Sequence, residues 1–343
     1  MNKNWFIGID VSKKTLDASI FVAGEVINRF PHTQVRNDKE GFKELLKWLK
    51  ERGVRLQDAL IGLEFTGYYS DALEQFLTRK KLCYTMLPTT VVKHYQRGTH
   101  DKNDKADSAK IADYLFRFQD TECIKQRVLP SKVMQELKAL KSERKFYVRH
   151  RTDCENRQKV AKSKDEQKNL QKLIDLYNKE IELIEQKMAE VVTSDDEIYL
   201  TYTRLLTIPG IGPVNAINTI ANTQNFTAFE TARQYAKYVG VAPSEHLSGT
   251  SVRWRSRPSP HSDLQAKADL SMAAMRAVEF SIEMNIYYER KLGSRPDDKD
   301  VKRKALNAVK FKLIRQMFSV AKQHKNFILM QQAEIHNTDQ RVN

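Results

Sequence analysis

The chain has 343 residues, more than a single hydrophobic core usually holds, so two or three structural units are expected. Its 58 Lys and Arg against 43 Asp and Glu give a formal net charge of +15, which attracts polyanions and favours nucleic acid as partner. The sequence has no apolar run long enough to span a bilayer and no signal-peptide pattern. Cys83, Cys123 and Cys154 form no CxxC pair, which argues against a zinc site and indicates a reduced, cytoplasmic protein.

Residues 5–88 predict an α/β unit. The apolar runs WFIGID, LDASIFVA and VINRF, separated by turns, predict a meander of three strands. A helical stretch FKELLKWLK, a strand LIGLEF, a second helical stretch DALEQFLTRK and a strand CYTMLP follow. This order of elements is the plan of ribonuclease-H-like folds.

The middle of the chain predicts long helices. No glycine occurs between Gly98 and Gly210, and only Pro130 and Pro209 interrupt that stretch. A helix over residues 168–192 carries an apolar stripe at spacings of three and four, formed by Leu170, Leu173, Tyr177, Ile181, Ile184 and Met188. The stripe predicts a coiled coil or helical hairpin. It packs either on the preceding helix of the same chain or on another copy, and the sequence leaves both open.

Glycines and prolines return from residue 205 to about 260, and two helical stretches ending near residue 329 follow. We therefore expect four parts: a RuvC-like α/β domain over 1–125, a helical coiled-coil linker over 126–198, a mostly α domain with a helix-hairpin-helix over 199–330, and a tail over 331–343.

Four acidic residues are candidates for a shared metal site. Asp10 ends the first strand, Glu64 follows a short apolar run, and Asp104 and Asp107 lie three apart on a predicted helix, with Asp101 three residues before them. Each also has an ordinary explanation, as a capping residue or as part of a solvated, lysine-rich face. Two carboxylates about 4 Å apart repel by about 1 to 4 kcal/mol, and a divalent cation such as Mg²⁺ or Mn²⁺ would remove that repulsion if the acids converge.

The segment LLTIPGIGPVNAINTIANT resembles a helix-hairpin-helix. Gly210 and Gly212 let backbone N–H groups approach a phosphate, helped by the positive end of the following helix. An ordinary packing corner between two helices has the same pattern, and the sequence does not separate the two.

Further along, a loop carries Ser248 and Ser251, and three alternating arginines follow it. On an extended segment Arg253, Arg255 and Arg257 face one side and can follow a phosphate backbone. A Ser-Gly pair alone usually marks only a turn.

Taken together these blocks resemble the DEDD transposases of the IS110 insertion-sequence family. GIDVSKKTLDASI, GLEFTGYY and KNDKADSAKIADYL are similar to its acidic blocks, and IPGIGPVNA, FTAFETARQYAKYVGVAPSEHLSGTS and LSMAAMRA to its C-terminal transposase domain. The resemblance implies a RuvC-like nuclease domain whose metal ligands are Asp10, Glu64, Asp104 and Asp107. It also implies a serine nucleophile, matched by Ser248 with Ser251 as the alternate, while Asp101 lies just outside the matched block.

The resemblance further implies that the acids and Ser248 meet in a composite site, form a phosphoserine link to DNA and exchange strands. Donor and target DNA, a structured guide (bridge) RNA and a homodimer or homotetramer are the implied partners, in the cytoplasm of a bacterial or archaeal cell at the nucleoid. One stretch, RPSPHSDLQAKADL, departs from the Ile-Ser-Lys-x-Gly-Asn-like pattern of the family, so how this loop meets nucleic acid is not implied.

Two other classes of function compete with this interpretation. An actin-like ATP-dependent kinase also opens with a GIDVSKKTLDASIF-like strand, but the sequence holds no further glycine-rich phosphate loop. A non-catalytic RNA- or DNA-binding scaffold would share the positive charge. Substituting Asp10→Ala and Ser248→Ala separates them, since a scaffold tolerates both changes and a recombinase tolerates neither.

Overall fold

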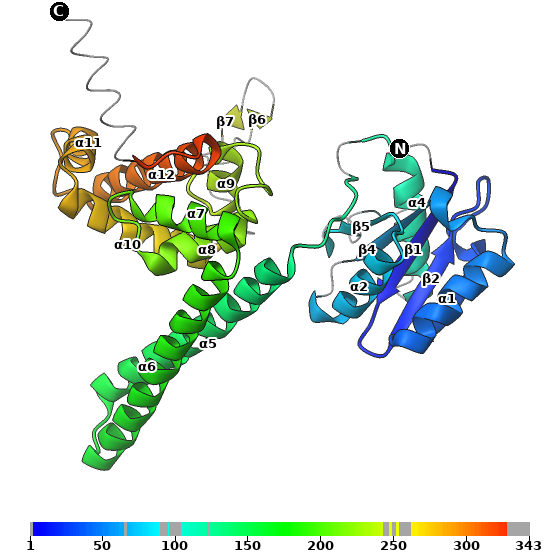
Figure 1. Cartoon of the computed structure of the whole chain (residues 1–343), viewed down its shortest axis with the longest axis horizontal. Coiled ribbons are helices and arrows are strands. Elements are labelled where there is room, and N and C mark those ends of the chain that lie inside the picture. The colour runs from blue at the N-terminus through cyan, green and yellow to red at the C-terminus, as the bar shows by residue number, and fades with distance from the viewer. Residues whose placement is uncertain are drawn as a thin grey trace, which may run out of the picture. The chain divides into compact units, whose positions relative to one another are not determined.

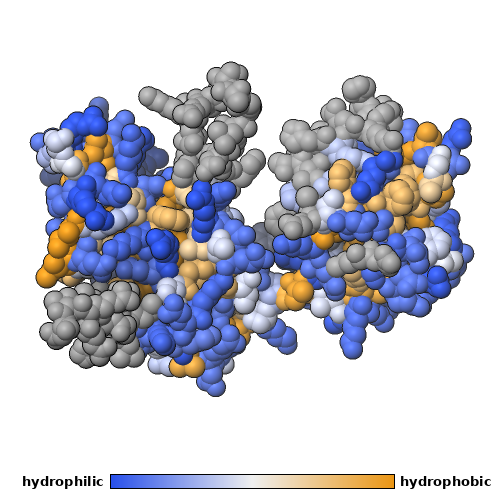
Figure 2. Space-filling view, turned by 90° about the horizontal axis from the view of Figure 1, so that it is seen from above, coloured by the Kyte–Doolittle hydropathy of each residue, from blue (hydrophilic) through white to orange (hydrophobic). Residues whose placement is uncertain are grey.

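The computed structural model describes residues 3–64, 67–89, 95, 104–121, 124–242, 247–248, 252–253 and 262–327, with the backbone alone for 104, 247, 248, 252 and 253. It divides into two compact units, 1–129 and 130–343. No helix in the described ranges is both long and apolar enough to cross a membrane. Figure 2 shows that hydrophilic side chains cover most of the visible surface of the described parts.

The first unit is a five-stranded mixed sheet flanked by helices (Figure 1). Its strand order is β3-β2-β1-β4-β5, with β1, β2 and β3 antiparallel and β4 and β5 parallel to β1. This is the expected ribonuclease-H-like plan, a meander continued by parallel strands. The elements are β1 (Trp5–Val11), β2 (Thr15–Ile20), η1 (Ile27–Arg29), β3 (His32–Arg36), α1 (Lys39–Glu51), η2 (Leu56–Asp58), β4 (Ala59–Glu64), η3 (Gly67–Ser70), α2 (Asp71–Arg79), β5 (Tyr84–Leu87) and α4 (Asp104–Phe118).

The third strand is not where the sequence predicts it. The run VINRF forms the 3-10 turn η1, and the polar segment His32–Arg36 pairs with β2 instead. Ile27 and Phe30 are buried beside Ala109 of α4, which explains the apolar run without a strand. In β3 the only buried residue is Val35, so its alternation is too weak to recognise from the sequence.

The second unit is almost entirely helical. Its elements are α5 (Lys132–Val160), α6 (Lys164–Thr193), α7 (Asp196–Leu206), α8 (Pro213–Thr223), α9 (Ala232–Tyr238), β6 (Leu247–Ser248), β7 (Val252–Arg253), α10 (Leu264–Phe280), α11 (Ile282–Leu292) and α12 (Lys299–Gln323). Between residues 262 and 327, three helices are therefore present where two helical stretches were expected. Ser281 makes the extra break because it ends α10 and its hydroxyl caps α11 at Met284 N.

Helices α5 and α6 lie side by side as a hairpin (Figure 1). Much of the predicted stripe on α6 is buried: Ile184 and Met188 belong to the same apolar core as Met134 and Leu137 of α5. Leu173 of that stripe is 42% exposed. Packing within the chain therefore accounts for part of the stripe, and the seam to another copy stays a prediction.

Candidate active site

Helix α4 crosses one face of the sheet at very short range. A Cβ atom added at Gly8 of β1 would lie 2.0 Å from the carbonyl oxygen of Ser108 and 2.4 Å from the nitrogen of Ala112. Farther down the strand, the ring of Phe6 meets that of Phe116 at 5.5 Å between centroids. Phe6 therefore lies beside the C-terminal part of α4, whereas Gly8 lies beside residues nearer its N-terminus. The helix thus runs antiparallel to β1.

Asp10 and Glu64 occupy matching places on adjacent strands. The parallel ladder pairs Gly8 with Gly62 and Ile9 with Leu63, and Asp10 and Glu64 are the next residues of the two strands. Because side chains alternate along a strand, both acids lie on the same face as the two glycines, which is the face that α4 covers. Both are partly buried. Two of the four expected ligands therefore share one face and one edge of the sheet.

The first turn of α4 brings the other two acids to the same end of the sheet. Because Ser108 lies against Gly8, Asp104 and Asp107 lie at the end of the strand where Asp10 is found. Asp107 has a side chain 29% exposed and accepts a hydrogen bond from Lys110 Nζ at 2.9 Å. Only the backbone of Asp104 is described, and Asp101 lies outside the described residues. Among the described side chains, no group of three His, Cys, Asp or Glu residues lies close enough together to hold a metal ion.

A fifth acid that the sequence reasoning missed is the cross-strand partner of Asp10. Asp17 of β2 pairs with Asp10 in the antiparallel register, so it lies on the same face of the sheet. It is 3% exposed and accepts hydrogen bonds from His32 Nε2 at 2.9 Å and from Gln34 Nε2 at 3.1 Å. Asp17 could have been recognised from the sequence because Asp17 and Ser19 alternate with apolar residues along β2. Pairing of β2 with β1 as a hairpin then places Asp17 opposite Asp10.

In the second unit the two glycines of the predicted helix-hairpin-helix differ in environment. Gly210 has φ +86° and an added Cβ would lie 2.4 Å from the carbonyl oxygen of Ala273, so its Cα faces the backbone of α10. Gly212 has open space around its Cα and precedes Pro213, the first residue of α8. Gly210 is therefore required for packing, and the phosphate contact expected of this pair stays a prediction for the turn around Gly212.

The serine-bearing segment contains a short hairpin in which Leu247 of β6 pairs with Arg253 of β7, and Ser248 with Val252. The side chains of Ser248 and Arg253 are outside the described residues, as are Ser251, Arg255 and Arg257 altogether. Their predicted roles are therefore neither supported nor opposed by the geometry.

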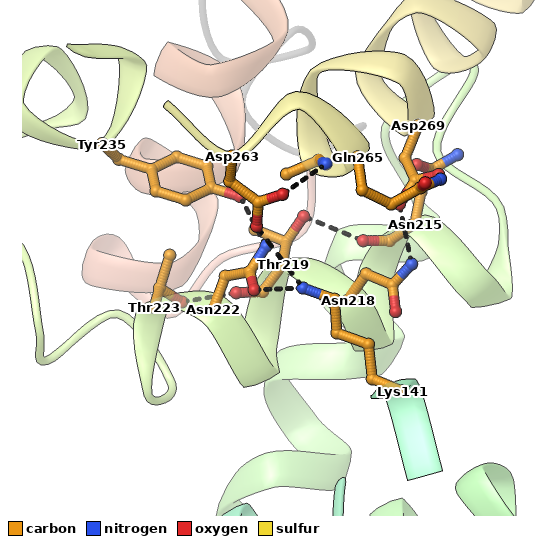
Figure 3. A network of polar contacts seen from close by, with 11 residues as sticks. Lys141, Asn215, Asn218, Thr219, Asn222, Thr223, Tyr235, Asp263, Gln265 and Asp269 are labelled. Atoms are coloured by element: carbon orange, nitrogen blue, oxygen red, sulfur yellow. Dashed lines mark hydrogen bonds and ion pairs between the residues drawn. The ribbon is translucent and has the colours of Figure 1, made fainter. Parts of the chain in front are cut away.

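A buried polar network closes the base of this segment (Figure 3). Asp263 N donates to Tyr238 O at 3.0 Å, which joins the chain before the hairpin to the chain after it. Lys141, from α5, points into the network, donates to Asn222 Oδ1 and lies 3.7 Å from Asp263 Oδ2. Asn218 Nδ2 donates to Asp269 Oδ2 at 2.9 Å and so extends the network along α10.

Burial sets the electrostatics of this network. It lowers the pKa of Lys141, and the charges of Asp263 and Asp269 oppose that change only in part. Burial likewise raises the pKa of Tyr235, whose hydroxyl accepts from Asn222 at 3.5 Å. A buried ion pair gives little net stability compared with apolar packing, so the network mainly restricts how α5, α8 and α10 fit together.

Comparison with known proteins covers both units. A family model described as Transposase, DEDD_Tnp_IS110, matches residues 7–161, and a second, described as Transposase IS116/IS110/IS902 family, matches residues 202–289. Pilin gene-inverting proteins of Moraxella bovis and Moraxella lacunata are each 24% identical over 260 residues, covering 73% of this chain and 76% of theirs. The solved structure of T. thermophilus RuvC in complex with a Holliday junction substrate matches 36% of this chain and 99% of its own at 10% identity, with a TM-score of 0.26.

Proposed function

The chain belongs to the IS110 family of transposases, enzymes that cut and rejoin DNA, and we propose that it does so with Ser248 as nucleophile and four acids as metal ligands. The acids are Asp10, Glu64, Asp104 and Asp107. The observation that carries this proposal is the matched position of Asp10 and Glu64 on β1 and β4, with the acidic first turn of α4 at the same end of the sheet.

The chemistry of the acids suits Mg²⁺ or Mn²⁺. Carboxylate oxygens are the ligands that these ions prefer, and no sulfur or imidazole belongs to the proposed set. Such ions, when bound, stabilise the attacking and leaving oxygens of a phosphoryl transfer. The protein contributes the close placement of its acids, because α4 packs directly on the backbone of β1 at Gly8.

The serine supplies the covalent step. A serine hydroxyl is a weak nucleophile at neutral pH and reacts only when its proton is removed. As Ser248 Oγ bonds to phosphorus, the bond from phosphorus to the 3′ oxygen breaks, and that oxygen takes up a proton. Attack by a different 3′ hydroxyl then forms a new phosphodiester and returns the proton to Ser248, which completes the strand exchange.

Donor DNA, target DNA and a structured guide RNA are the proposed partners, in the cytoplasm at the nucleoid. The net charge of +15 supports binding to such polyanions. Each neutralised phosphate releases counterions, so binding should weaken steeply as salt rises. Fluorescence anisotropy of the full chain with labelled element-end DNA measures this, and an affinity that does not change between low and physiological salt contradicts the proposal.

We also propose that the protein acts as a homodimer or homotetramer. Leu173, Leu176 and Leu183 of α6 are 42%, 49% and 41% exposed and lie at spacings of three and seven, which is typical of a helical seam. Light scattering after size exclusion measures the mass. If the protein is a monomer at micromolar concentration with and without DNA, the proposal is wrong.

The decisive experiment traps the covalent intermediate. Wild type, Ser248→Ala, Ser251→Ala and Asp10→Asn proteins are incubated with labelled element-end DNA and Mg²⁺, denatured, and separated to detect DNA attached to protein. We expect the adduct with wild type and Ser251→Ala only, and mass spectrometry should place it on Ser248. An adduct on Ser251 would show that Ser251 is the nucleophile in place of Ser248. Recombination that survives both Ser248→Ala and Asp10→Asn would indicate a non-catalytic scaffold.

A further inference from the structure

A group of positive side chains lies between α10 and α12, close in the chain to the serine-bearing hairpin. Lys267 Nζ of α10 donates to Gly240 O at 2.7 Å, and Asn307 Nδ2 of α12 donates to Val241 O at 2.6 Å. These carbonyls belong to consecutive residues. The ends of the Lys267 and Asn307 side chains therefore lie close together, a few residues before β6.

Two more cations share this face of α12. Arg303, Asn307 and Lys310 are spaced by four and three residues, which places them on one side of the helix. Lys310 is only 7% exposed, and its side-chain ammonium makes neither a hydrogen bond nor an ion pair with any described residue. Arg303, at the outer end, is 76% exposed in its side chain and pairs with the equally exposed Asp300 at 3.2 Å.

The charges in this group repel one another. Burial lowers the pKa of Lys310 and the charge of Lys267 lowers it further, while burial and then Arg303 lower the pKa of Lys267. No carboxylate offsets either effect among the described residues. A buried charge without a counter-charge is costly, so cations that converge in this way are a site that gains from an anion.

We propose that Lys267, Arg303 and Lys310 bind a backbone phosphate of a nucleic-acid strand near Gly240 and Val241, a few residues before β6 in the sequence. The inference rests on the proposed function, which supplies the nucleic acid. The arrangement suits a phosphodiester because it joins the exposed guanidinium of Arg303, a group that forms paired hydrogen bonds to phosphate, to Lys310, a residue that is only 7% exposed. DNA and RNA present the same phosphate chemistry.

The test compares Lys310→Met with Lys312→Met in the full-length protein. Lys312 lies on the same helix with a side chain 24% exposed, but its charge is already paired with Glu283 at 2.5 Å. Anisotropy is measured over a salt series with a 30-base-pair duplex of the element end and with a structured RNA. Losing one phosphate contact should reduce the slope of log affinity against log salt by about 0.9 for duplex DNA and about 0.7 for a single strand.

We expect Lys310→Met to reduce the slope for at least one nucleic acid, Lys310→Arg to restore it, and Lys312→Met to leave it unchanged. The arm that responds identifies the strand as DNA or RNA. Thermal melting in added inorganic phosphate, at constant ionic strength, tests the site without nucleic acid: wild type should be stabilised more than Lys310→Met.

A folded Lys310→Met protein with unchanged slopes in both arms overturns the phosphate site, as does an equal reduction in Lys312→Met. If Lys310→Met does not fold, the exposed residue Arg303 is tested instead, because Arg303→Gln should reduce the salt slope by the same amount. If nucleic-acid binding by the wild-type protein does not depend on salt, the proposed function is refuted instead. If inorganic phosphate stabilises the wild type but Lys310→Met has unchanged slopes, the site binds only free anions and the proposal is overturned.

Discussion

Replacing Gly8 by alanine should separate α4 from the sheet and disable the acidic site. The new Cβ would lie 2.0 Å from the Ser108 carbonyl oxygen and 2.4 Å from the Ala112 nitrogen, and both are backbone atoms that no side-chain rotation can move. Non-bonded atoms sit roughly 3.5 Å apart, so helix and strand must separate by about 1.5 Å. Overpacking of this kind costs about 1–3 kcal/mol, and a displacement of about 1 Å at a catalytic group costs about 100-fold in rate.

Gly62→Ala is the matched control because Gly62 pairs with Gly8 on the next strand. The nearest neighbours of its new Cβ would be side-chain atoms of α4 rather than backbone, with Leu115 Cδ1 at 2.8 Å and Ile111 Cγ2 at 2.9 Å, so the helix needs to move less. Urea unfolding and DNA strand cleavage are measured for both variants. If Gly8→Ala matches Gly62→Ala in stability and cleaves DNA at the wild-type rate, α4 does not cross the sheet at Gly8 and the reasoning fails.

Three further predictions concern the second unit. Gly210→Ala should lower the free energy of unfolding by about 1–3 kcal/mol, because its Cβ would strike the backbone of α10, and Gly212→Ala, with open space, should lower it less; urea unfolding ranks them. Lys141→Met should destabilise the fold by about 1–3 kcal/mol by leaving Asn222 Oδ1 without its donor and Asp263 without its counter-charge, and a double-mutant cycle with Asp263→Asn should show coupling; simple additivity would argue against the network. Because the folded-state pKa of Lys310 lies below 10.5, the unfolded chain binds more protons in the alkaline range, so stability from this group should rise with pH up to 10.5. Lys310→Met should flatten that rise in pH-dependent unfolding.

Local patterns were enough to predict the core strands and the strand-end positions of two of the candidate acids. WFIGID and LIGLE lie in β1 and β4 because their alternating apolar residues fill two faces of a buried sheet, and that alternation also places Asp10 and Glu64 at strand ends. The third strand was missed because pairing with β2, rather than apolar content, makes His32–Arg36 a strand.

Features that depend on distant parts of the chain were not predictable. The turn around Gly210 has the pattern of a phosphate-binding hairpin, but α10, more than 50 residues later, packs against it. Similarly, Lys141 lies in a highly charged helix, yet its side chain is only 17% exposed and contacts Asn222 and Asp263. A single sequence gives no sign of such pairings.

The long hairpin of α5 and α6 could transmit a force from its tip to the rest of the second unit. From Lys141 to the end of α5 at Val160 the helix extends about 29 Å. Swinging it by about 10° about Lys141 would carry its tip through an arc of about 5 Å. Because Lys141 is paired with Asp263, and Asp263 N is hydrogen-bonded to Tyr238 O, a force applied at the remote tip would act on the two residues that flank the β6–β7 segment in the sequence.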